Sequence, residues 1–270
     1  MTRRPRASRP LVVKLGGRAL ETPGAAQEFA RALAALDRRA IVVHGGGSEV
    51  TAWCSKLGIE SRFEGGLRVT DTATLEVATA VLAGLANKRL VALLRAAGVH
   101  ALGMAALDAG VLEVERHGND VLGEVGQVTG ANAAALEHLL GFGCTPVIAS
   151  IGATAEGDLL NVNADDAASA IAVAVGAPDL VLLSDTPGLK LNGEIVSELR
   201  WSQFEATLEH PQVVGGMKPK LAGAMAAVRG GVERVHIASW CGPDTLHGLL
   251  VERTHGTVLR CSNPGERLFA

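Results

Sequence analysis

Five short apolar runs, each followed closely by glycine and then an alanine-rich stretch, constrain the fold of this 270-residue chain most strongly. Such unbroken hydrophobicity is typical of strands that are buried on both faces, which occur in parallel sheets covered by helices. The sequence therefore predicts an α/β fold, a three-layer αβα sandwich around a mainly parallel open sheet. The runs are Leu11–Leu15, Ile41–Val43, Val147–Ser150, Leu180–Ser184 and Val235–Ala238.

The stretches between these runs have the composition and periodicity of helices. The segment from Val111 to Leu122 differs, because alternating apolar and charged residues lead into turn-forming residues, and this predicts a β-hairpin added at one end of the sheet. We expect an N-terminal lobe over residues 11–176 and a C-terminal lobe over residues 177–270, which share one continuous sheet. Residues 1–10, with four arginines, are expected to form a disordered tail. The predicted helices are Ala25–Leu36, Ser48–Leu57, Thr72–Ala97, Ala131–Leu140, Ala164–Val175 and Lys218–Val228.

Composition excludes several classes of protein. Aromatic residues make up 3% of the chain and the net charge is −3, which disfavours a single-stranded nucleic-acid binder. The four cysteines are scattered without metal-ligand spacing, so reduced cytosolic thiols are expected. No apolar run approaches the roughly 18 uncharged residues that span a bilayer, and no signal peptide is evident. We therefore predict a cytoplasmic protein without a membrane or nucleic-acid partner.

Glycine runs at two predicted strand ends indicate an anion site. Lys14-Leu15-Gly16-Gly17 ends the first strand, and His44-Gly45-Gly46-Gly47-Ser48 follows the second. Consecutive glycines let backbone N–H groups approach an anion, and a helix N-terminus adds a favourable field. Neither run has the spacing of a dinucleotide-binding or P-loop motif. A lysine inside a buried strand suits stabilisation of a transferring phosphoryl group.

Two further clusters fit the same chemistry. In an extended chain, Asn161, Asn163 and Asp165 would point to one side, although an ordinary helix cap is the simpler interpretation. Lys218 and Lys220 begin a predicted helix, where positive charge is unfavourable unless an anion lies nearby. We expect one of these two lysines to be solvated.

Together these motifs resemble those of the amino acid kinase family, from about Leu11 to the C-terminus. Their order and spacing are most similar to the branch whose acceptor is N-acetyl-L-glutamate. The motifs are Lys14-Leu15-Gly16-Gly17, His44-Gly45-Gly46-Gly47, Gly66-Leu67-Arg68-Val69-Thr70, Asn161-Val162-Asn163-Ala164-Asp165 and Gly216-Met217 with Lys220.

The resemblance implies transfer of the γ-phosphoryl group of ATP to the side-chain carboxylate of N-acetyl-L-glutamate, the second step of arginine biosynthesis. Lys14 and Lys220 correspond to the lysines that stabilise the transition state, and Asp165 to the carboxylate that orients them. The implied acceptor-site residues are Gly45, Gly46, Arg68, Asn161 and Asn163, with Arg68 gripping the carboxylate that does not react.

The resemblance also places ATP in the C-terminal lobe. Gly17 and Gly45 match backbone donors that face the phosphoryl group. A carboxylate acceptor is already ionised, so His44 is not required as a base. We expect Mg²⁺ to be held by the ATP phosphates and not by protein ligands. The residues that match the nucleotide site are Gly16, Gly17, Asp185, Thr186, Pro187, Gly188, Leu189, Val213, Val214, Gly215 and Gly216.

Other functions stay open at this point. The acceptor is alternatively a carrier-linked or acetylated 2-aminoadipate of lysine biosynthesis, and a carbamate, aspartate or uridylate kinase is a more distant possibility. A non-catalytic sensor of an amino acid or nucleotide is a third class. Because only about ten residues precede Leu11, without the long N-terminal helix of arginine-inhibited hexamers, we expect an arginine-insensitive homodimer.

Overall fold

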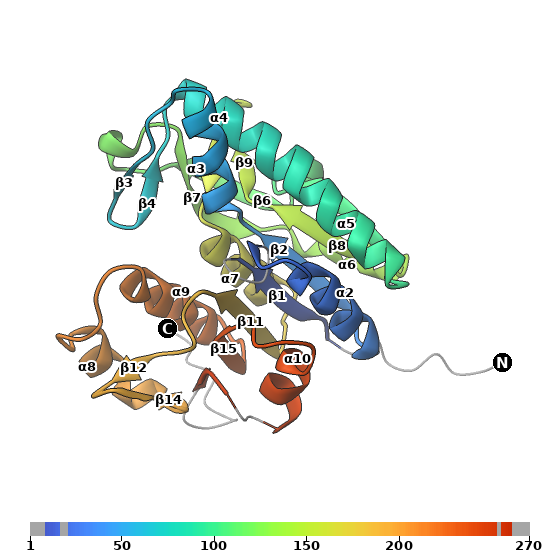
Figure 1. Cartoon of the computed structure of the whole chain (residues 1–270), viewed down its shortest axis with the longest axis vertical. Helices are drawn as coiled ribbons and strands as arrows, with labels where there is room; N and C mark the ends of the chain where they lie inside the picture. The colour runs from blue at the N-terminus through green and yellow to red at the C-terminus, as the bar shows by residue number, and fades with distance from the viewer. Residues whose placement is uncertain (1–8, 17–20, 253–254, 261–270) are drawn as a thin grey trace.

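The computed structural model describes residues 9–16, 21–252 and 255–260, and its centre is an eight-stranded sheet (Figure 1). Most of the predicted tail and Gly17 lie outside the described residues. The strand order is β14-β16-β15-β11-β1-β2-β8-β5. In that order the bounds are Glu198–Arg200, Thr257–Arg260, Arg234–Ser239, Asp179–Ser184, Leu11–Leu15, Ala40–His44, Thr145–Ala149 and Ala101–Ala105.

The strands from β15 to β5 are parallel to one another, whereas β16 is antiparallel to β15. All five predicted strands are confirmed to within two residues. The sheet contains strands from both sides of residue 176, so it is continuous, as expected; the lobe boundary itself stays a prediction.

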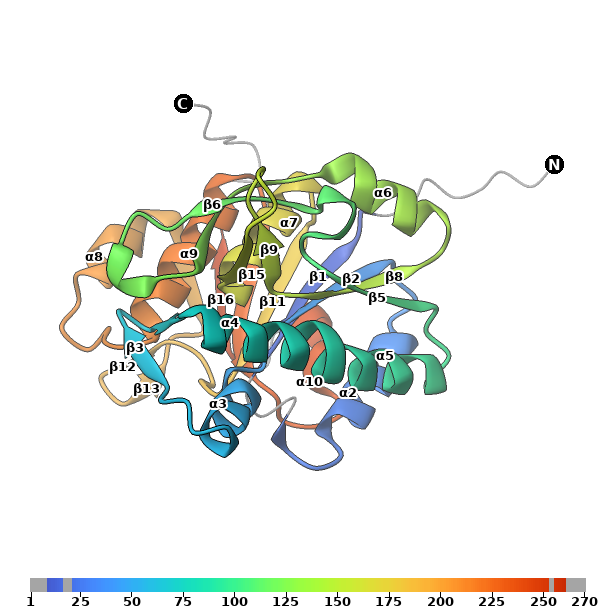
Figure 2. The same cartoon turned by 90° about the horizontal axis from the view of Figure 1, so that it is seen from above.

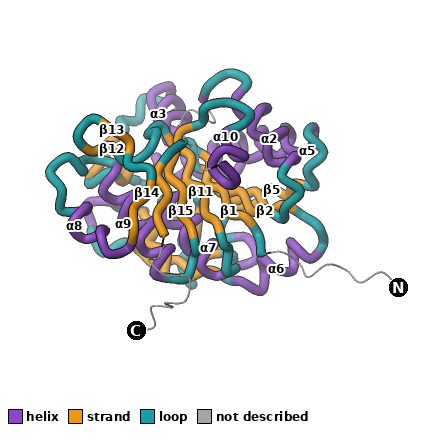
Figure 3. Tube along the Cα trace, turned by 90° about the horizontal axis from the view of Figure 1, so that it is seen from below, coloured by secondary structure: helices purple, strands orange, loops and turns teal. Residues whose placement is uncertain are grey.

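Helices cover both faces of this sheet, and Figure 3 shows the strands as a central layer between them. Leu11, Val13 and Leu15 of β1 pack into a cluster with α2 and α5, while Val12 packs with α6, α7 and α9 on the opposite face. This alternation is the period of a strand, and it directs Lys14 to the α7 face. The helices are α2 (Ala25–Ala35), α3 (Gly47–Lys56), α4 (Thr72–Thr79), α5 (Asn87–Ala96), α6 (Ala133–Gly141), α7 (Ala164–Ala174), α8 (Phe204–Leu208), α9 (Met217–Arg229) and α10 (Thr245–His247).

The predicted hairpin is wrong in its place and in its second strand. Strand β6 (Leu112–Arg116) pairs with β7 (Val125–Ala131), and Val121 and Leu122 instead lie in a short 3₁₀ helix, η3 (Asp120–Leu122). With β9 (Ile151–Ala153) and β10 (Leu159–Val162), these strands form a separate four-stranded sheet. Apolar residues of this sheet, including Val114 and Leu160, join the core on the α7 face, so it packs over the main sheet.

The remaining short elements are mostly hairpins and single helical turns. Two hairpins project from the body, β3 (Arg62–Glu64) with β4 (Leu67–Val69) and β12 (Lys190–Leu191) with β13 (Glu194–Ile195). The single turns are the 3₁₀ helices η2 (Asp108–Gly110) and η4 (Trp201–Gln203) and the π-helix η5 (Gly248–Glu252).

The predicted helix Thr72–Ala97 is a rod interrupted by a π-helix, η1 (Ala80–Ala86), between α4 and α5 (Figure 2). Within the described residues this one helix is long and apolar enough to cross a membrane by length and composition, a test that core helices of soluble proteins also pass. The expectation that the protein has no membrane partner stays a prediction.

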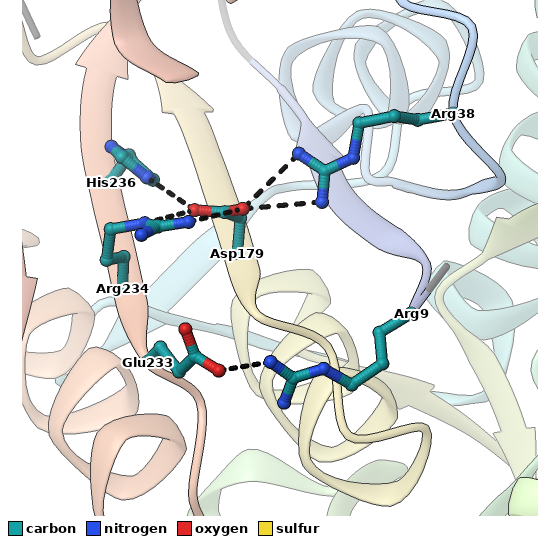
Figure 4. A network of polar contacts seen from close by, with 6 residues as sticks. All are labelled: Arg9, Arg38, Asp179, Glu233, Arg234 and His236. Carbon is teal, nitrogen blue, oxygen red and sulfur yellow. Dashed lines mark hydrogen bonds and ion pairs between the residues drawn. The ribbon is translucent and has the colours of Figure 1, made fainter. Parts of the chain in front are cut away.

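A buried ionic cluster joins segments at the N-terminal ends of the strands (Figure 4). Asp179, at the start of β11, accepts hydrogen bonds from Arg234 Nε and Nη2 at 2.6 and 3.0 Å. His236 Nε2 lies 3.2 Å from the same carboxylate, and Arg38 contacts it at 3.3 Å from the turn before β2. Burial raises the pKa of Asp179, but hydrogen bonds from His236 and Arg234 outweigh this effect and lower the pKa. The carboxylate is therefore ionised and ties β15 and the α2–β2 turn to β11.

Candidate active site

Three charged side chains predicted to be catalytic converge at the carboxyl end of β1. Lys14 Nζ lies 3.0 Å from Asp165 Oδ1, and Lys220 Nζ donates a hydrogen bond to Asp165 Oδ2 at 2.5 Å. Asp165 belongs to the first turn of α7, and Lys220 to the first turns of α9. One carboxylate therefore holds two ammonium groups on its two oxygens, and the sequence prediction that these residues meet is confirmed.

The charges of this triad are shielded from solvent. The side chains of Lys14, Asp165 and Lys220 are 12%, 16% and 8% exposed. Burial raises the pKa of Asp165, but Lys14 and then Lys220 outweigh it and lower the pKa to about 2. Burial also lowers the pKa of Lys220, and Asp165 opposes that shift. At neutral pH the carboxylate is ionised, and the triad carries a net positive charge that can accept an anion.

Lys218 and Lys220 differ as expected. Lys218 is exposed on α9, whereas Lys220 is buried and turned toward α7. Pro219 lies between them within the first helical turn, where its missing N–H costs no hydrogen bond.

A cavity of about 230 Å³ opens beside the triad. The glycine runs form one wall, and a Cβ at Gly16 would lie 2.6 Å from Lys14 Nζ and would displace that ammonium group. Helix α3 begins at Gly47 without a side-chain cap, and Gly46, Gly47 and Val50 at its N-terminal end line the cavity. The predicted residues that line the cavity are Lys14, Gly16, Gly45, Gly46, Arg68, Asn161, Asn163 and Asp165.

The Gly45 N–H differs from the expectation that it faces a phosphoryl group. It donates to Leu15 O at 3.3 Å, which closes the gap between β1 and β2 beyond their last paired residues. To donate to a substrate, the Gly45 N–H would have to give up this long hydrogen bond to Leu15 O. Its predicted role as a donor to the phosphoryl group therefore stays a prediction.

Arg68 lines the cavity and is already hydrogen-bonded on two of its nitrogens. Its Nη2 donates to Gly47 O at 2.6 Å and to Thr51 Oγ1 at 2.8 Å, and its Nη1 donates to Ser61 Oγ at 2.9 Å. The guanidinium also lies 4.7 Å from the centre of the Phe63 ring. A two-bond approach to a carboxylate uses one Nη2 hydrogen. A bidentate grip therefore requires exchange of a bond that now holds α3.

Asn161 and Asn163 lie at the cavity, but the predicted extended path through Asp165 is wrong. Strand β10 ends at Val162, and Asn163 caps α7 by accepting from the N–H groups of Asp165 and Asp166. Asp165 consequently reaches the triad from a helix. Asn161 donates to Thr70 Oγ1 at 3.1 Å. The simpler interpretation of Asn163 as a cap is correct.

Of the residues predicted to bind the nucleotide, Gly16 lines this cavity and Gly17 lies outside the described residues, whereas the remaining set does not line the cavity. Burial lowers the pKa of Lys220, and Asp185 is close enough to oppose that shift in the pKa of Lys220. Gln212 Oε1 accepts from the backbone N–H of Asn192, which links the loop before α9 to the β12–β13 hairpin. The set comprises Asp185, Thr186, Pro187, Gly188 and Leu189 after β11, and Val213, Val214, Gly215 and Gly216 before α9.

Several residues that line the cavity were not predicted from the sequence, among them Phe63, Leu82 and Val125. Phe63 is 57% exposed on the β3–β4 hairpin. Gly65-Gly66 between two short alternating runs is a pattern that predicts this hairpin, but the hairpin was not among the predicted elements. Leu82 lies on the π-helix, and no sequence pattern indicated that segment.

An αβα sandwich with two buried lysines on one carboxylate, beside glycine-rich strand ends, defines a phosphotransferase for anionic substrates. Residues 9–239 match the model of the amino acid kinase family, and the chain belongs to that family.

Relatives of known activity match over most of the chain. It is 43% identical to the acetylglutamate kinase of Methanopyrus kandleri over 259 residues, which cover 92% of this chain and 99% of that protein. It is 39% identical to the acetylglutamate kinase of Chloroflexus aurantiacus over 252 residues, which cover 92% and 97%.

Solved structures confirm the fold. A Streptococcus mutans protein, smu.665, superposes with a TM-score of 0.79 at 29% identity, covering 93% of this chain and 98% of that one. The carbamate kinase of Giardia superposes with a TM-score of 0.71 at 12% identity, covering 94% and 99%.

Proposed function

We propose that this chain transfers the γ-phosphoryl group of ATP to the side-chain carboxylate of N-acetyl-L-glutamate, giving N-acetyl-L-glutamyl 5-phosphate and ADP, in arginine biosynthesis. The observation that carries this proposal is the Lys14–Asp165–Lys220 triad beside the cavity that Arg68 and Asn161 line. The acetylglutamate kinase relatives support the acceptor.

The triad suits this reaction because both reactants are anions. Lys14 and Lys220 neutralise charge on the oxygens of the transferring group. Asp165 lies between their two ammonium groups, so it holds them in place and offsets the repulsion between them. The acceptor carboxylate needs no general base. Catalysis then depends on placing the acceptor carboxylate in line with the γ-phosphorus of ATP, and on the positive charges of Lys14 and Lys220 held beside it.

Mg²⁺ fits this site as a partner of ATP and not as a resident ion. Among the described residues there is no group of three or more His, Cys, Asp or Glu side chains that could hold a metal ion. The two oxygens of Asp165 face two lysines, so they are not free to bind a cation. The ATP phosphates would hold the ion, which supplies further charge neutralisation when it is bound.

The lobes and the assembly are part of the same proposal. We assign the acceptor to residues 11–176 and ATP to residues 177–270. A homodimer is supported by the position of β5 at the end of the main sheet, where Leu102 is 41% exposed. Light scattering should give twice the chain mass of 27.8 kDa, with activity unchanged by sub-millimolar arginine. A hexameric mass or arginine inhibition would contradict this assembly.

A coupled assay of ADP release with three acceptors tests the proposed substrate. At saturating MgATP, kcat/KM for N-acetyl-L-glutamate should exceed that for N-acetyl-L-2-aminoadipate by about 10–200-fold, the usual discrimination for one methylene. Glutamate, which lacks the acetyl group, should be poorer still. Equal or better use of the aminoadipate derivative would favour the lysine-pathway acceptor. Binding of both substrates without ADP release would favour a sensor.

A further inference from the structure

His44 is fully buried at the end of β2, and its hydrogen bonds fix its tautomer. Nδ1 lies 2.9 Å from Gly45 O, and because a carbonyl oxygen only accepts, Nδ1 carries the proton. Nε2 then accepts from Asn87 Nδ2 at 3.0 Å. Burial lowers the pKa of His44 to about 4, so the ring is neutral at physiological pH. The imidazole is therefore a fixed donor to the first glycine of the cavity wall.

Asn87 is oriented as firmly as the imidazole. It is fully buried, its Nδ2 also donates to Val147 O at 2.9 Å, and its Oδ1 accepts from Lys88 Nζ at 2.9 Å. These contacts decide which end of the amide is nitrogen, and so they require Nε2 of His44 to be the acceptor. A wrong tautomer would leave two buried polar groups unpaired.

The π-helix delivers Asn87 to this position. Its seven residues end immediately before Asn87, and π-helical segments, which are rare, frequently lie at functional sites. Leu82 of the same segment packs against Gly46, which has φ 155°, and a Cβ at Gly46 would lie 2.9 Å from Leu82 Cδ2. Gly46 is therefore in contact with Leu82 of η1, and Gly45 is linked through His44 to Asn87 of α5.

Because the peptide between Gly45 and Gly46 is planar, the hydrogen bond from His44 to Gly45 O also sets the direction of the Gly46 N–H. The C=O of Gly45 and the N–H of Gly46 belong to one peptide group and point in opposite directions. Because Gly45 O points to the buried imidazole, the Gly46 N–H points away from it. Gly45 and Gly46 both line the cavity, so that N–H is directed at the side where the acceptor and the phosphoryl group would meet.

We propose that His44 and Asn87 are positioning residues that lock the Gly45–Gly46 peptide so that the Gly46 N–H serves as an oxyanion donor in phosphoryl transfer. This inference rests on the proposed function. His44 acts through the peptide and transfers no proton, and Asn87 acts through His44.

Two substitutions of His44 separate this role from a merely structural one. In His44→Asn the amide nitrogen can replace Nδ1 and still donate to Gly45 O, while the contact with Asn87 is lost. In His44→Gln the amide can replace Nε2 and keep Asn87, while the donor to Gly45 O is lost. We expect kcat to fall less than about 10-fold in His44→Asn and about 100-fold in His44→Gln, the loss typical of one oxyanion donor. KM for the acceptor should change little in either variant.

The wild-type chain is measured first with MgATP and N-acetyl-L-glutamate. Absence of turnover would overturn the proposed function, whereas turnover with His44→Gln as active as His44→Asn would overturn only the positioning role. MgATP binding by calorimetry and a cooperative melt establish that each variant is folded.

Asn87→Leu provides a second test if one His44 variant does not fold. It removes the donor that fixes the tautomer, so we expect kcat to fall about 10-fold, within the range of coupled contacts. The double variant His44→Asn with Asn87→Leu should have a kcat less than about 2-fold below that of His44→Asn, which already lacks that contact. If the kcat of the double variant falls by the product of the two single losses, the proposed coupling is wrong.

Discussion

Replacing Lys220 with alanine should lower kcat about 1,000-fold, because removal of one donor that stabilises transition-state charge typically costs 100- to 1,000-fold. Here the loss is compounded, since Asp165 would keep only Lys14 as a partner. KM for MgATP should rise much less than kcat falls. Steady-state kinetics with the coupled ADP assay measures both values.

Lys218→Ala is the matched control, two residues away on the same helix. Lys218 is exposed and lies outside the triad, so we expect its loss to change kcat less than about 2-fold, in line with a surface substitution. If Lys218 proves essential and Lys220 dispensable, the assignment of the catalytic lysine is wrong. Lys220→Arg adds a check, because a guanidinium keeps the charge but not the geometry of the contact with Asp165.

Replacing Asp179 with alanine should lower the free energy of unfolding by about 3 kcal/mol, because breaking a buried pair leaves its cations uncompensated. We take the lower end of the usual range because Arg38 and Arg234 are partly exposed. For a chain of this size the thermal midpoint should fall by roughly 6–12 °C. Denaturant melts and calorimetry measure the change. The kcat of the folded variant should be unchanged, since Asp179 starts β11 and the triad lies at the opposite strand ends.

Glu233→Ala is the control for Asp179. Its contact with Arg9 lies beside the same cluster in Figure 4, but both side chains are about half exposed. Exposed ion pairs contribute about 0–1 kcal/mol, so this variant should be nearly as stable as the wild type. Equal destabilisation by the two substitutions would show that burial does not determine the contribution of Asp179.

Strands buried on both faces were the easiest elements to predict. The run Leu11–Leu15 is apolar except for Lys14, and β1 has these same bounds. Strands near the end of the sheet carry a weaker signal: β16, Thr257–Arg260, mixes polar and apolar residues because one of its faces is less covered. The register that places β16 between β14 and β15 depends on contacts that a single sequence does not display.

For the candidate site, the sequence indicated which residues to consider more readily than how they are arranged. Glycine runs and misplaced charges identified Lys14 and Lys220, since such features violate local preferences unless an anion is bound. The assumption of an extended chain through Asp165 failed because Asn163 caps a helix there. The π-helix and the His44–Asn87 contact were not predictable, because they depend on how a distant helix packs against the end of β2.

Phosphorus NMR of the wild-type chain with MgATP and N-acetyl-L-glutamate tests the central claim most directly. We predict that an acyl phosphate signal appears as the γ-phosphorus signal of ATP declines, that hydroxylamine converts it to a hydroxamate, and that Lys220→Ala leaves ATP intact over the same interval. Release of inorganic phosphate and ADP without an acyl phosphate, or no consumption of ATP while both substrates bind, would contradict the account.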